Sequence, residues 1–519
     1  MKGTLTQSMS WLHTWCGLLL GWVLLAIFLT GTLAVFDKEI SWWMQPELVD
    51  RAKPASEAAN LAQRWLTTHH PGESNWNISL PTERSPALGI SVGERRRGGE
   101  GITYLDALTG ERLEPRETVG GDFFFRFHYS LNLPRMMGVW MVGFAAMAML
   151  VALISGIVIH KKIFKEFFTF RPAKGQRSWL DAHNASAVLL LPFHLMITYT
   201  GLVIFFLIYM PAAVDALYDG DRQAYFSETQ PAPAVTRAVD ETRTRPALAP
   251  EAPLTPLGGL VARAEAQFGR NMIAGLAVTN PGRANAEVTV RPVLGHRIEL
   301  SRGDDMVFNG VTGELIREPQ VSRTSQRIQQ VMTGLHFAQF GGYPMRWLYF
   351  LCGLISTGMI ATGLVLYTVK QRKQAKSNPA FLKLVESLNV SVIAGLALAC
   401  IALLWANRLL PTGLMERQSW ELRLFFSVWV LSWVHGWLRR PMQAWRQQLF
   451  LAGTLALGLP LLDLVTTGLT ADATRVSLLA GVSVMGLGLG WTSWKIPTIV
   501  AARKAQAASL NRPASGVSL

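Results

Sequence analysis

The sequence predicts a polytopic α-helical membrane protein. It would combine a four-helix bundle, two small α+β domains outside the membrane and a C-terminal extension of four further membrane helices. Half of the 519 residues are hydrophobic and only 16% are charged, a composition too apolar for an ordinary soluble protein. Apolar runs of about 20 residues, each long enough to cross a bilayer, recur along the chain. Two long polar segments lie among the first four runs, and each repeats the pattern of the other.

The apolar runs predict eight transmembrane helices. The runs lie near 14–36, 138–160, 184–210, 346–369, 388–406, 422–438, 449–469 and 476–496. The last two would alternatively form one re-entrant pair. The first run has too long an apolar core for a cleaved signal peptide, and no small-residue cleavage site follows it, so we expect it to remain as a membrane anchor.

The net charge of +14 is distributed as membrane topology requires. Residues 37–137 and 211–345 each hold slightly more acidic than basic residues, so the whole positive excess lies elsewhere, mostly in short loops. Because loops rich in Lys and Arg stay in the cytoplasm, this pattern places both termini inside and both polar segments outside. It also removes the basis for a nucleic-acid partner, since no basic patch remains.

This topology divides the chain into spans, external domains and loops. The parts are a first span within 1–36, an external domain over 37–137, a span at 138–160, a cytoplasmic loop at 161–179, a span at 180–210, a second external domain over 211–345 that includes a Pro-rich linker near 229–254, a span at 346–369, a cytoplasmic loop at 370–387, the four-helix extension at 388–496 and a cytoplasmic tail at 497–519.

The two external segments are built alike. Each contains a helix-like stretch, at 55–69 and 256–271, followed by a strand, Thr-Gly-Glu in a tight turn and another strand, at 104–114 and 307–318. A β-rich run that is interrupted by such a turn is typical of a hairpin. Each segment is therefore predicted to form one small α+β domain.

Four histidines recur at equivalent places in the two halves of the bundle. His13 and His183 are each followed, at the same distance, by Thr-Gly; His128 and His336 are each followed, at nearly the same distance, by Ser-Gly or Thr-Gly. Small residues of this kind let membrane helices approach closely, so they are expected to mark helix contacts. The small pairs are Thr30-Gly31, Thr200-Gly201, Ser155-Gly156 and Thr362-Gly363.

These histidines favour haem. A histidine inside a membrane helix is expensive and rare, and the topology places His13 and His183 near the inner face and His128 and His336 near the outer face. Two imidazoles from neighbouring helices can supply the axial ligands of a b-type haem, and a four-helix bundle is a common scaffold for such a site. We therefore predict two haem b groups, one at each face.

Two further histidines have no counterpart in the other half. Leu24 stands at the position equivalent to His194, and Tyr367 at the position equivalent to His160. His160 would join the inner group and His194 the outer group, as alternative axial ligands or as hydrogen-bond partners of a ligand or a haem propionate. A metal-ion conduit is the alternative, but it would need carboxylates, and the first four spans hold almost none beyond Asp181.

Three arginines flank the outer histidines. Arg126, Arg135 and Arg346 could pair with haem propionates or with an anionic chelate. Arg346 follows the backbone-permissive "GGYP" turn beside His336.

Five segments carry a family resemblance. They are "WLHTWCGLLLGWVLLAIFLTGTLAVF", "FHYSLNLPRMMG", "HKKIFKEFFTFRP", "WLDAHNASAVLLLPFHLMITYTGL" and "LHFAQFGGYPMRWLYFLCGLISTGMIATGL". Over about residues 1–375 the chain resembles the PepSY-associated transmembrane family of bacterial inner-membrane proteins, and the two "TGE" segments resemble its periplasmic PepSY domains. Within that family it most resembles the siderophore-iron reductases. The helices after about residue 385 resemble an accessory membrane domain without an assigned role.

The resemblance implies a haem-dependent oxidoreductase that reduces ferric siderophore in the periplasm and releases Fe(II) for uptake. Since no nucleotide or flavin motif occurs in the chain, the electron donor would be external, either a quinol or a cytoplasmic flavin reductase. Two other functions stay open: a PepSY-based periplasmic regulator or binding module without redox activity, and a siderophore or metal transporter, for which Asp463 is the one carboxylate in the seventh span.

Overall fold

The computed structural model describes two compact units. The helical unit comprises Met1–Met44, Glu117–Thr198 and Phe350–Leu519, and the sheet unit comprises Gln45–Arg116 and Tyr199–Tyr349. The residues that the structure describes are 4–48, 53–93, 101–160, 171, 175–229, 249–300, 304–319, 322–374, 378–469 and 472–510. Most of the predicted loop at 161–179, most of the Pro-rich linker at 229–254 and the end of the predicted tail lie outside them.

Within the described residues, five helices are long and apolar enough to cross a membrane, and the count rises to seven if each of two bent pairs forms one span. The five are α6 (Arg135–Ile159), α15 (Gly342–Gln371), the continuous run of α16 (Pro379–Val390), η2 (Ser391–Gly395) and α17 (Leu396–Leu409), α19 (Pro441–Thr467), and α20 (Ala473–Leu510) up to Ile496. The sixth predicted span is also a helix, α18 (Arg417–Leu438), but its Trp, Ser and charged residues lower its hydropathy and it is not among them.

The two bent pairs are the first and third predicted spans. α1 (Leu5–Leu19) and α2 (Gly21–Ala34) meet at 61°, and α8 (Gln176–Leu189) and α9 (Leu191–Ile204) meet at 67°. Pro192 explains the second break, because its ring clashes with the carbonyl four residues earlier. Gly21 marks the first, where a Cβ would lie 2.9 Å from the Leu364 side chain. Both breaks fall the same distance after His13 and His183, so the duplication extends to the bends.

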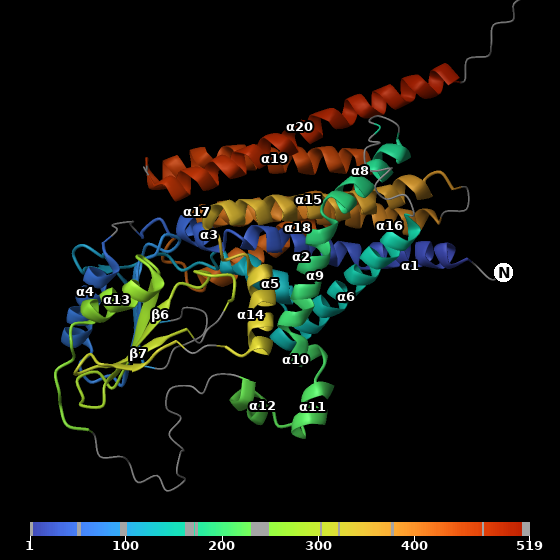
Figure 1. Ribbon diagram of the computed structural model, residues 1–519. Helices are drawn as coiled ribbons and strands as arrows, with labels where there is room; N and C mark the ends of the chain where they lie inside the picture. Colours follow the sequence, from blue (N-terminus) through green and yellow to red (C-terminus); the bar gives the residue numbers. More distant parts are fainter. Residues whose placement is uncertain are drawn as a thin grey trace, which may run out of the picture. The chain divides into compact units, whose positions relative to one another are not determined.

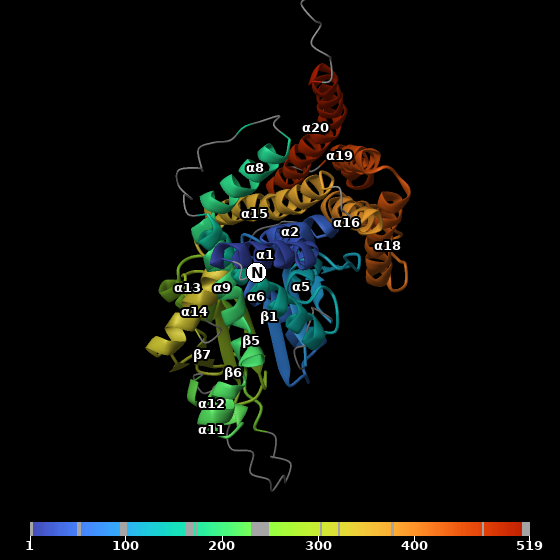
Figure 2. The same cartoon turned by 90° about the vertical axis from the view of Figure 1, so that its right-hand side faces the viewer.

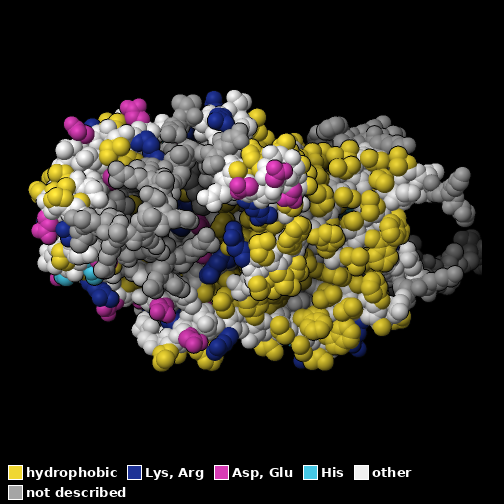
Figure 3. Space-filling view, turned by 90° about the horizontal axis from the view of Figure 1, so that it is seen from below, with side chains coloured by type: hydrophobic (Ala, Val, Ile, Leu, Met, Phe, Trp, Pro, Cys, Tyr) yellow, Lys and Arg dark blue, Asp and Glu magenta, His cyan; other side chains and the backbone are white. Residues whose placement is uncertain are grey.

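Apolar side chains remain exposed on the long helices. On α6 these include Met136, Trp140, Phe144 and Ile154, and Figure 3 shows hydrophobic side chains spread over a broad face of the helices. Such a surface would be covered by lipid tails. The chain is therefore a multi-pass membrane protein.

Small residues let α19 and α20 of the C-terminal extension pack closely. α19 and α20 lie side by side (Figures 1 and 2), and a Cβ on Gly453 would lie 2.9 Å from the backbone of Gly490. Each of the two helices is long enough to cross a membrane alone. The structure therefore shows two separate helices here, as predicted, with the length and apolar composition of two spans.

The sheet unit contains one eight-stranded sheet with the order β4-β3-β2-β1-β5-β6-β7-β8, antiparallel throughout. The strands are β1 (Asn75–Ser79), β2 (Leu88–Val92), β3 (Thr103–Leu105), β4 (Arg112–Leu113), β5 (Ile273–Thr279), β6 (Glu287–Pro292), β7 (Met306–Asn309) and β8 (Leu315–Arg317). The accompanying helices are α4 (Ala55–His69), α10 (Phe206–Tyr209), α11 (Ala212–Tyr218), α12 (Arg222–Thr229), α13 (Leu257–Phe268) and α14 (Thr324–Phe337).

The two external segments are joined and do not form two independent domains. β1 pairs with β5 in the middle of the sheet, with Trp76 opposite Val278 and Ile78 opposite Leu276. α4 and α13 pack against the strands and each other (Figure 1), and one hydrophobic core takes residues from both segments. Separated, each four-stranded half would expose β1 or β5 as an open edge and would hold only a small core.

The predicted helices at 55–69 and 256–271 and both predicted hairpins are confirmed. The two turns are chemically the same. Asp106 accepts hydrogen bonds from the backbone N–H groups of Leu108 and Thr109, and Asn309 accepts them from those of Val311 and Thr312. Such side chains mimic a backbone turn. The glycines that follow have φ of 78° and 72°, where a side chain would be strained.

The helical unit also includes two stretches that the sequence assigned to the first external domain. They are α3 (Asp37–Met44) and the region of α5 (Asp122–Ser130). Trp43 and Phe123 are completely buried there among residues of the C-terminal helices. The polar residues on these two short helices, such as Lys38 and Arg126, make both stretches resemble an external segment in the sequence, although one side of each helix is apolar and buried.

The central strand pair gives a first prediction. A Cβ on Gly275 would lie 2.3 Å from the carbonyl oxygen of Ile78, so Gly275→Val should separate β5 from β1 and lower the stability of the sheet unit by about 1–3 kcal/mol. Thermal unfolding of the full chain measures this. Gly259→Ala is the control, because its Cβ would meet nothing within 4 Å. Equal melting temperatures for the two variants would contradict the joined sheet.

Candidate functional site

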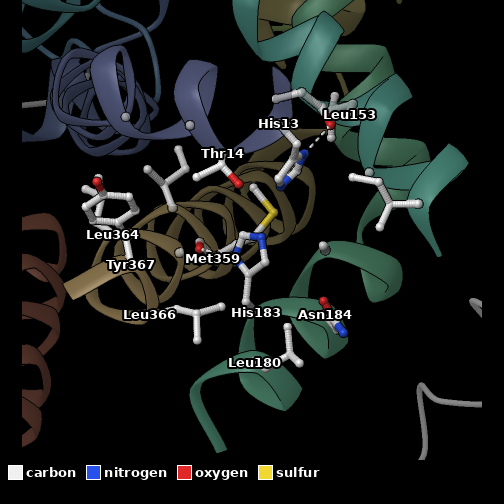
Figure 4. Close-up of a pocket in the computed structure, with 18 of the residues that line it drawn as sticks. His13, Thr14, Leu153, Leu180, His183, Asn184, Met359, Leu364, Leu366 and Tyr367 are labelled. Carbon is white, nitrogen blue, oxygen red and sulfur yellow. Dashed lines mark hydrogen bonds between the residues drawn. The ribbon is translucent and has the colours of Figure 1, made fainter. Parts of the chain in front are cut away.

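A cavity of about 370 Å³ lies within the helical unit. Its walls come from α1 and the start of α2, the second half of α6, α8 with the first residue of α9, and the second half of α15 (Figure 4). Most of the lining is apolar, including Leu18, Leu153 and Leu364. The size and character are those of a site for an organic ligand or cofactor.

His13 and His183 lie on the walls of this cavity and face one another. Their ring centres are 6.2 Å apart and the ring planes are inclined by 72°, and Figure 4 shows the two side chains approaching from α1 and α8. The structure thus brings together the two histidines that the sequence assigned to the inner face.

Hydrogen bonds fix the protonation of both rings. His13 Nδ1 lies 2.9 Å from the carbonyl oxygen of Ala152, and His183 Nδ1 lies 2.8 Å from that of Met359. Because a carbonyl can only accept, each Nδ1 carries the proton and each Nε2 keeps its lone pair. Within the described residues neither Nε2 has a hydrogen-bond partner. A ring held by Nδ1 with a free Nε2 is the usual arrangement of a metal-ligating histidine.

The spacing of the rings fits a shared iron. A nitrogen–metal distance of about 2 Å, with roughly 1 Å from that nitrogen to its ring centre, puts two axial imidazole centres about 6 Å apart. The observed 6.2 Å agrees with this value. The donor set and the apolar walls therefore fit a b-type haem.

Each repeated histidine lies against one of the repeated glycines. The glycine is not the one that follows the histidine along the chain but the one on the neighbouring helix of the same half. A Cβ added to any of the four glycines would lie between 2.5 and 3.4 Å from the ring. In three of the pairs Nδ1 bonds to the carbonyl four residues before the glycine, which a larger side chain would cover. The pairs are His13 with Gly156, His128 with Gly31, His183 with Gly363 and His336 with Gly201.

The two outer histidines belong to different units. His128, on α5 in the helical unit, donates from Nδ1 to the carbonyl oxygen of Ile27 at 2.8 Å. His336, on α14 in the sheet unit, has its Nδ1 3.1 Å from the hydroxyl of Thr200. Both repeat the ring-on-glycine arrangement of the inner pair.

Polar residues also line the cavity. His160 follows the last residue of α6 and lines the cavity with His13 and His183. Sequence reasoning missed Lys370 and Asn184, which line the same cavity. A signal for Lys370 exists in the sequence, because this residue begins a basic loop at the end of an apolar run. Such a loop indicates the cytoplasmic side of the membrane and does not by itself indicate a binding residue.

His194 has a different environment. It is completely buried, and its Nε2 lies 2.9 Å from the hydroxyl of Ser356, which itself donates to the carbonyl oxygen of Cys352. The backbone of Ala187, on α8, offers the ring a second hydrogen bond. The Thr198 hydroxyl, one turn further along α9, is buried without a partner in the described part of the chain.

The three arginines are placed differently from one another. Arg126 forms an ion pair of 3.0 Å with Asp122 on its own helix, and Arg135 is exposed at the first residue of α6. Arg346 is buried and donates to the carbonyl oxygen of Gln339. Asp181, the carboxylate of the third span, is held by Arg171 at 3.0 Å.

The fold and the site define a multi-pass membrane protein with paired histidines set into a helical cavity. Residues 10–370 match the family model described as "PepSY-associated TM region", and the chain belongs to that family. No curated protein matches the chain significantly.

The ring-on-glycine contact gives a second prediction. In Gly31→Ala the new Cβ would lie 2.5 Å from His128 Nδ1, so the ring must leave the Ile27 carbonyl, at a cost of about 1–3 kcal/mol. Thermal unfolding of the full chain should show the loss. Gly17→Ala is the matched control in the same bent pair, because its Cβ would meet nothing, and it should melt at or slightly above the wild-type temperature.

Proposed function

We propose that this protein is a transmembrane electron-transfer enzyme of the bacterial inner membrane. It would bind two b-type haems and reduce ferric iron held by a siderophore in the periplasm, like the siderophore-iron reductases of its family. The observation that carries the proposal is the pair His13 and His183, 6.2 Å apart across an apolar cavity with each Nδ1 tied to a carbonyl.

At the inner site, His13 and His183 would hold the haem iron. The carbonyls of Ala152 and Met359 hold the rings in the ligating tautomer and orientation, and second contacts of this kind also raise the basicity of a ligand. Lys370 and Asn184, which line the cavity, would bind the propionates. The haem supplies one-electron transfer, and the protein contributes binding, orientation and exclusion of water.

At the outer site, the proposed ligands are His128 and His336. The support is the internal repeat: each ring rests on a glycine of the partner helix, as the inner rings do. His194 stays the alternative ligand or a hydrogen-bond partner, and the second role suits it better because its Nε2 already bonds to Ser356. Arg346, Arg135 and Arg126 are proposed contacts for propionates or for the anionic chelate.

The chemistry of the substrate explains the direction of the reaction. Siderophores bind Fe(III) through hard oxygen donors, which bind Fe(II) much less tightly. One electron delivered on the outer side therefore releases the iron as Fe(II). The proposed topology, with both termini in the cytoplasm, lets an external quinol or cytoplasmic flavin reductase donate at the inner face.

A visible spectrum tests the proposal. The purified full chain should show reducible b-type haem bands on addition of dithionite, with two haems per chain by pyridine haemochrome. His13→Ala and His183→Ala should each lose about half of the haem, because the same inner site is destroyed. His69→Ala, at an exposed helix end of the sheet unit, is the control and should keep both haems. A wild-type spectrum without haem would overturn the proposal and favour the regulator or transporter.

Ferric reduction tests the substrate. Proteoliposomes with a reductant inside and a ferric siderophore outside, together with an Fe(II) chelator, should accumulate the coloured Fe(II) complex. His13→Ala should lower the rate at least tenfold, since the path across the membrane is interrupted, whereas His69→Ala should leave it unchanged. Full haem content with no reduction of any ferric chelate would keep electron transfer but reject the substrate.

A further inference from the structure

The extension that follows the family region is joined to the rest of the helical unit by buried charges. Arg417 and Glu421, on α18, have side chains with no solvent exposure and form an ion pair of 2.6 Å. Glu421 is also bonded to a segment just over three hundred residues earlier: it accepts hydrogen bonds from the Thr118 hydroxyl at 2.8 Å and the Val119 N–H at 2.9 Å.

Further hydrogen bonds, from Arg417 and from the neighbouring Asn407, strengthen the same connection between α18 and the segment before α5. Arg417 donates to the carbonyl oxygen of Glu117 at 2.6 Å, and Asn407, on α17, donates to Glu421 at 3.0 Å and to the Thr118 hydroxyl at 3.1 Å. Three consecutive residues, Glu117 to Val119, are thus held by one buried network. They lead directly into α5, the helix that carries His128.

Aromatic packing continues this contact along α5. The ring of Phe425 lies 4.8 Å from that of Phe123 and 6.1 Å from that of Phe127, centre to centre, and Trp429 lies 5.9 Å from Phe127. The next residue, His128, points to the other side and rests on Gly31 of α2. α5 is therefore clamped between α18 and α2.

A second buried pair anchors α3 in the same way. Arg408 on α17 binds Asp463 on α19 at 2.8 Å, lies over the Trp43 ring at 3.8 Å and donates to the Trp43 carbonyl oxygen. This ion pair also occupies Asp463, the carboxylate of the seventh span on which a transport path would depend.

A buried ion pair adds little net stability, because desolvation offsets the attraction, and its best-attested use is to specify one arrangement. Here the specified arrangement is the position of α5. We propose that the C-terminal extension is a positioning module for α5, in which Glu421, Arg417 and Phe425 are positioning residues that fix His128. This inference rests on the proposed function.

The test uses the full-length protein with three variants. Glu421→Gln places an amide donor among groups that donate to Glu421, and Phe425→Leu loosens the aromatic clamp without removing a charge. Trp405→Phe is the matched control: it removes one hydrogen bond inside the extension, from Trp405 to the Leu455 carbonyl at 2.9 Å. Hydrogen exchange of residues 117–131 and the midpoint potential of each haem component are measured, the components being assigned through His13→Ala and His128→Ala.

In Glu421→Gln and Phe425→Leu, we expect amide exchange over 117–131 to rise about tenfold and the midpoint of the His128-dependent haem to shift while the His13-dependent haem stays as in wild type. Trp405→Phe should do neither. Unchanged exchange and potentials in both variants, or equal shifts of both haems, would overturn the positioning role. Hydrogen exchange does not need haem, so a wild-type protein without haem that still shows the exchange pattern would reject the proposed function and keep the mechanical link.

Discussion

The arrangement of the helical unit depends on one repeated contact, an imidazole laid on a glycine. A glycine exposes the helix backbone, so a ring from the neighbouring helix can reach a carbonyl that already accepts a helical hydrogen bond. His13 does this at Gly156 and His183 at Gly363. The contact fixes the separation of two helices and also the tautomer of the ring, so packing and ligand orientation have the same cause.

The duplication is visible in the bends of the helices and in the pairing of the sheet as well as in the sequence. The bends at Leu20 and Leu190 follow equivalent histidines, although one is marked by Gly21 and the other by Pro192. In the sheet unit the two halves meet through antiparallel β1 and β5. These are the first strands of the two halves, so each half contributes the equivalent edge strand to the pairing. Each half of the sheet unit therefore covers the open strand edge of the other half, and the two halves share one hydrophobic core.

The histidines, the small residues and the hairpins could be predicted because their signals are local. The spacing of His13 to Thr30-Gly31 and of His183 to Thr200-Gly201 is visible in the chain, and so is the turn chemistry around Asp106 and Asn309. Partners could not be predicted: spacing along one helix does not reveal that His13 meets Gly156 on another. The joined sheet and the buried Glu421 network were hidden for the same reason, since both depend on residues far apart in sequence.

His194 shows how hydrogen bonding distinguishes residues that composition cannot. Its Nε2 bonds to the Ser356 hydroxyl, whereas in the described residues no hydrogen bond occupies the Nε2 of His13 or His183. The Thr198 hydroxyl lies on the same face of α9, one turn away, and is buried without a partner in the described residues. A buried hydroxyl of this kind is suited to hold a polar group or a water molecule, and this environment is distinct from that of the repeated histidines.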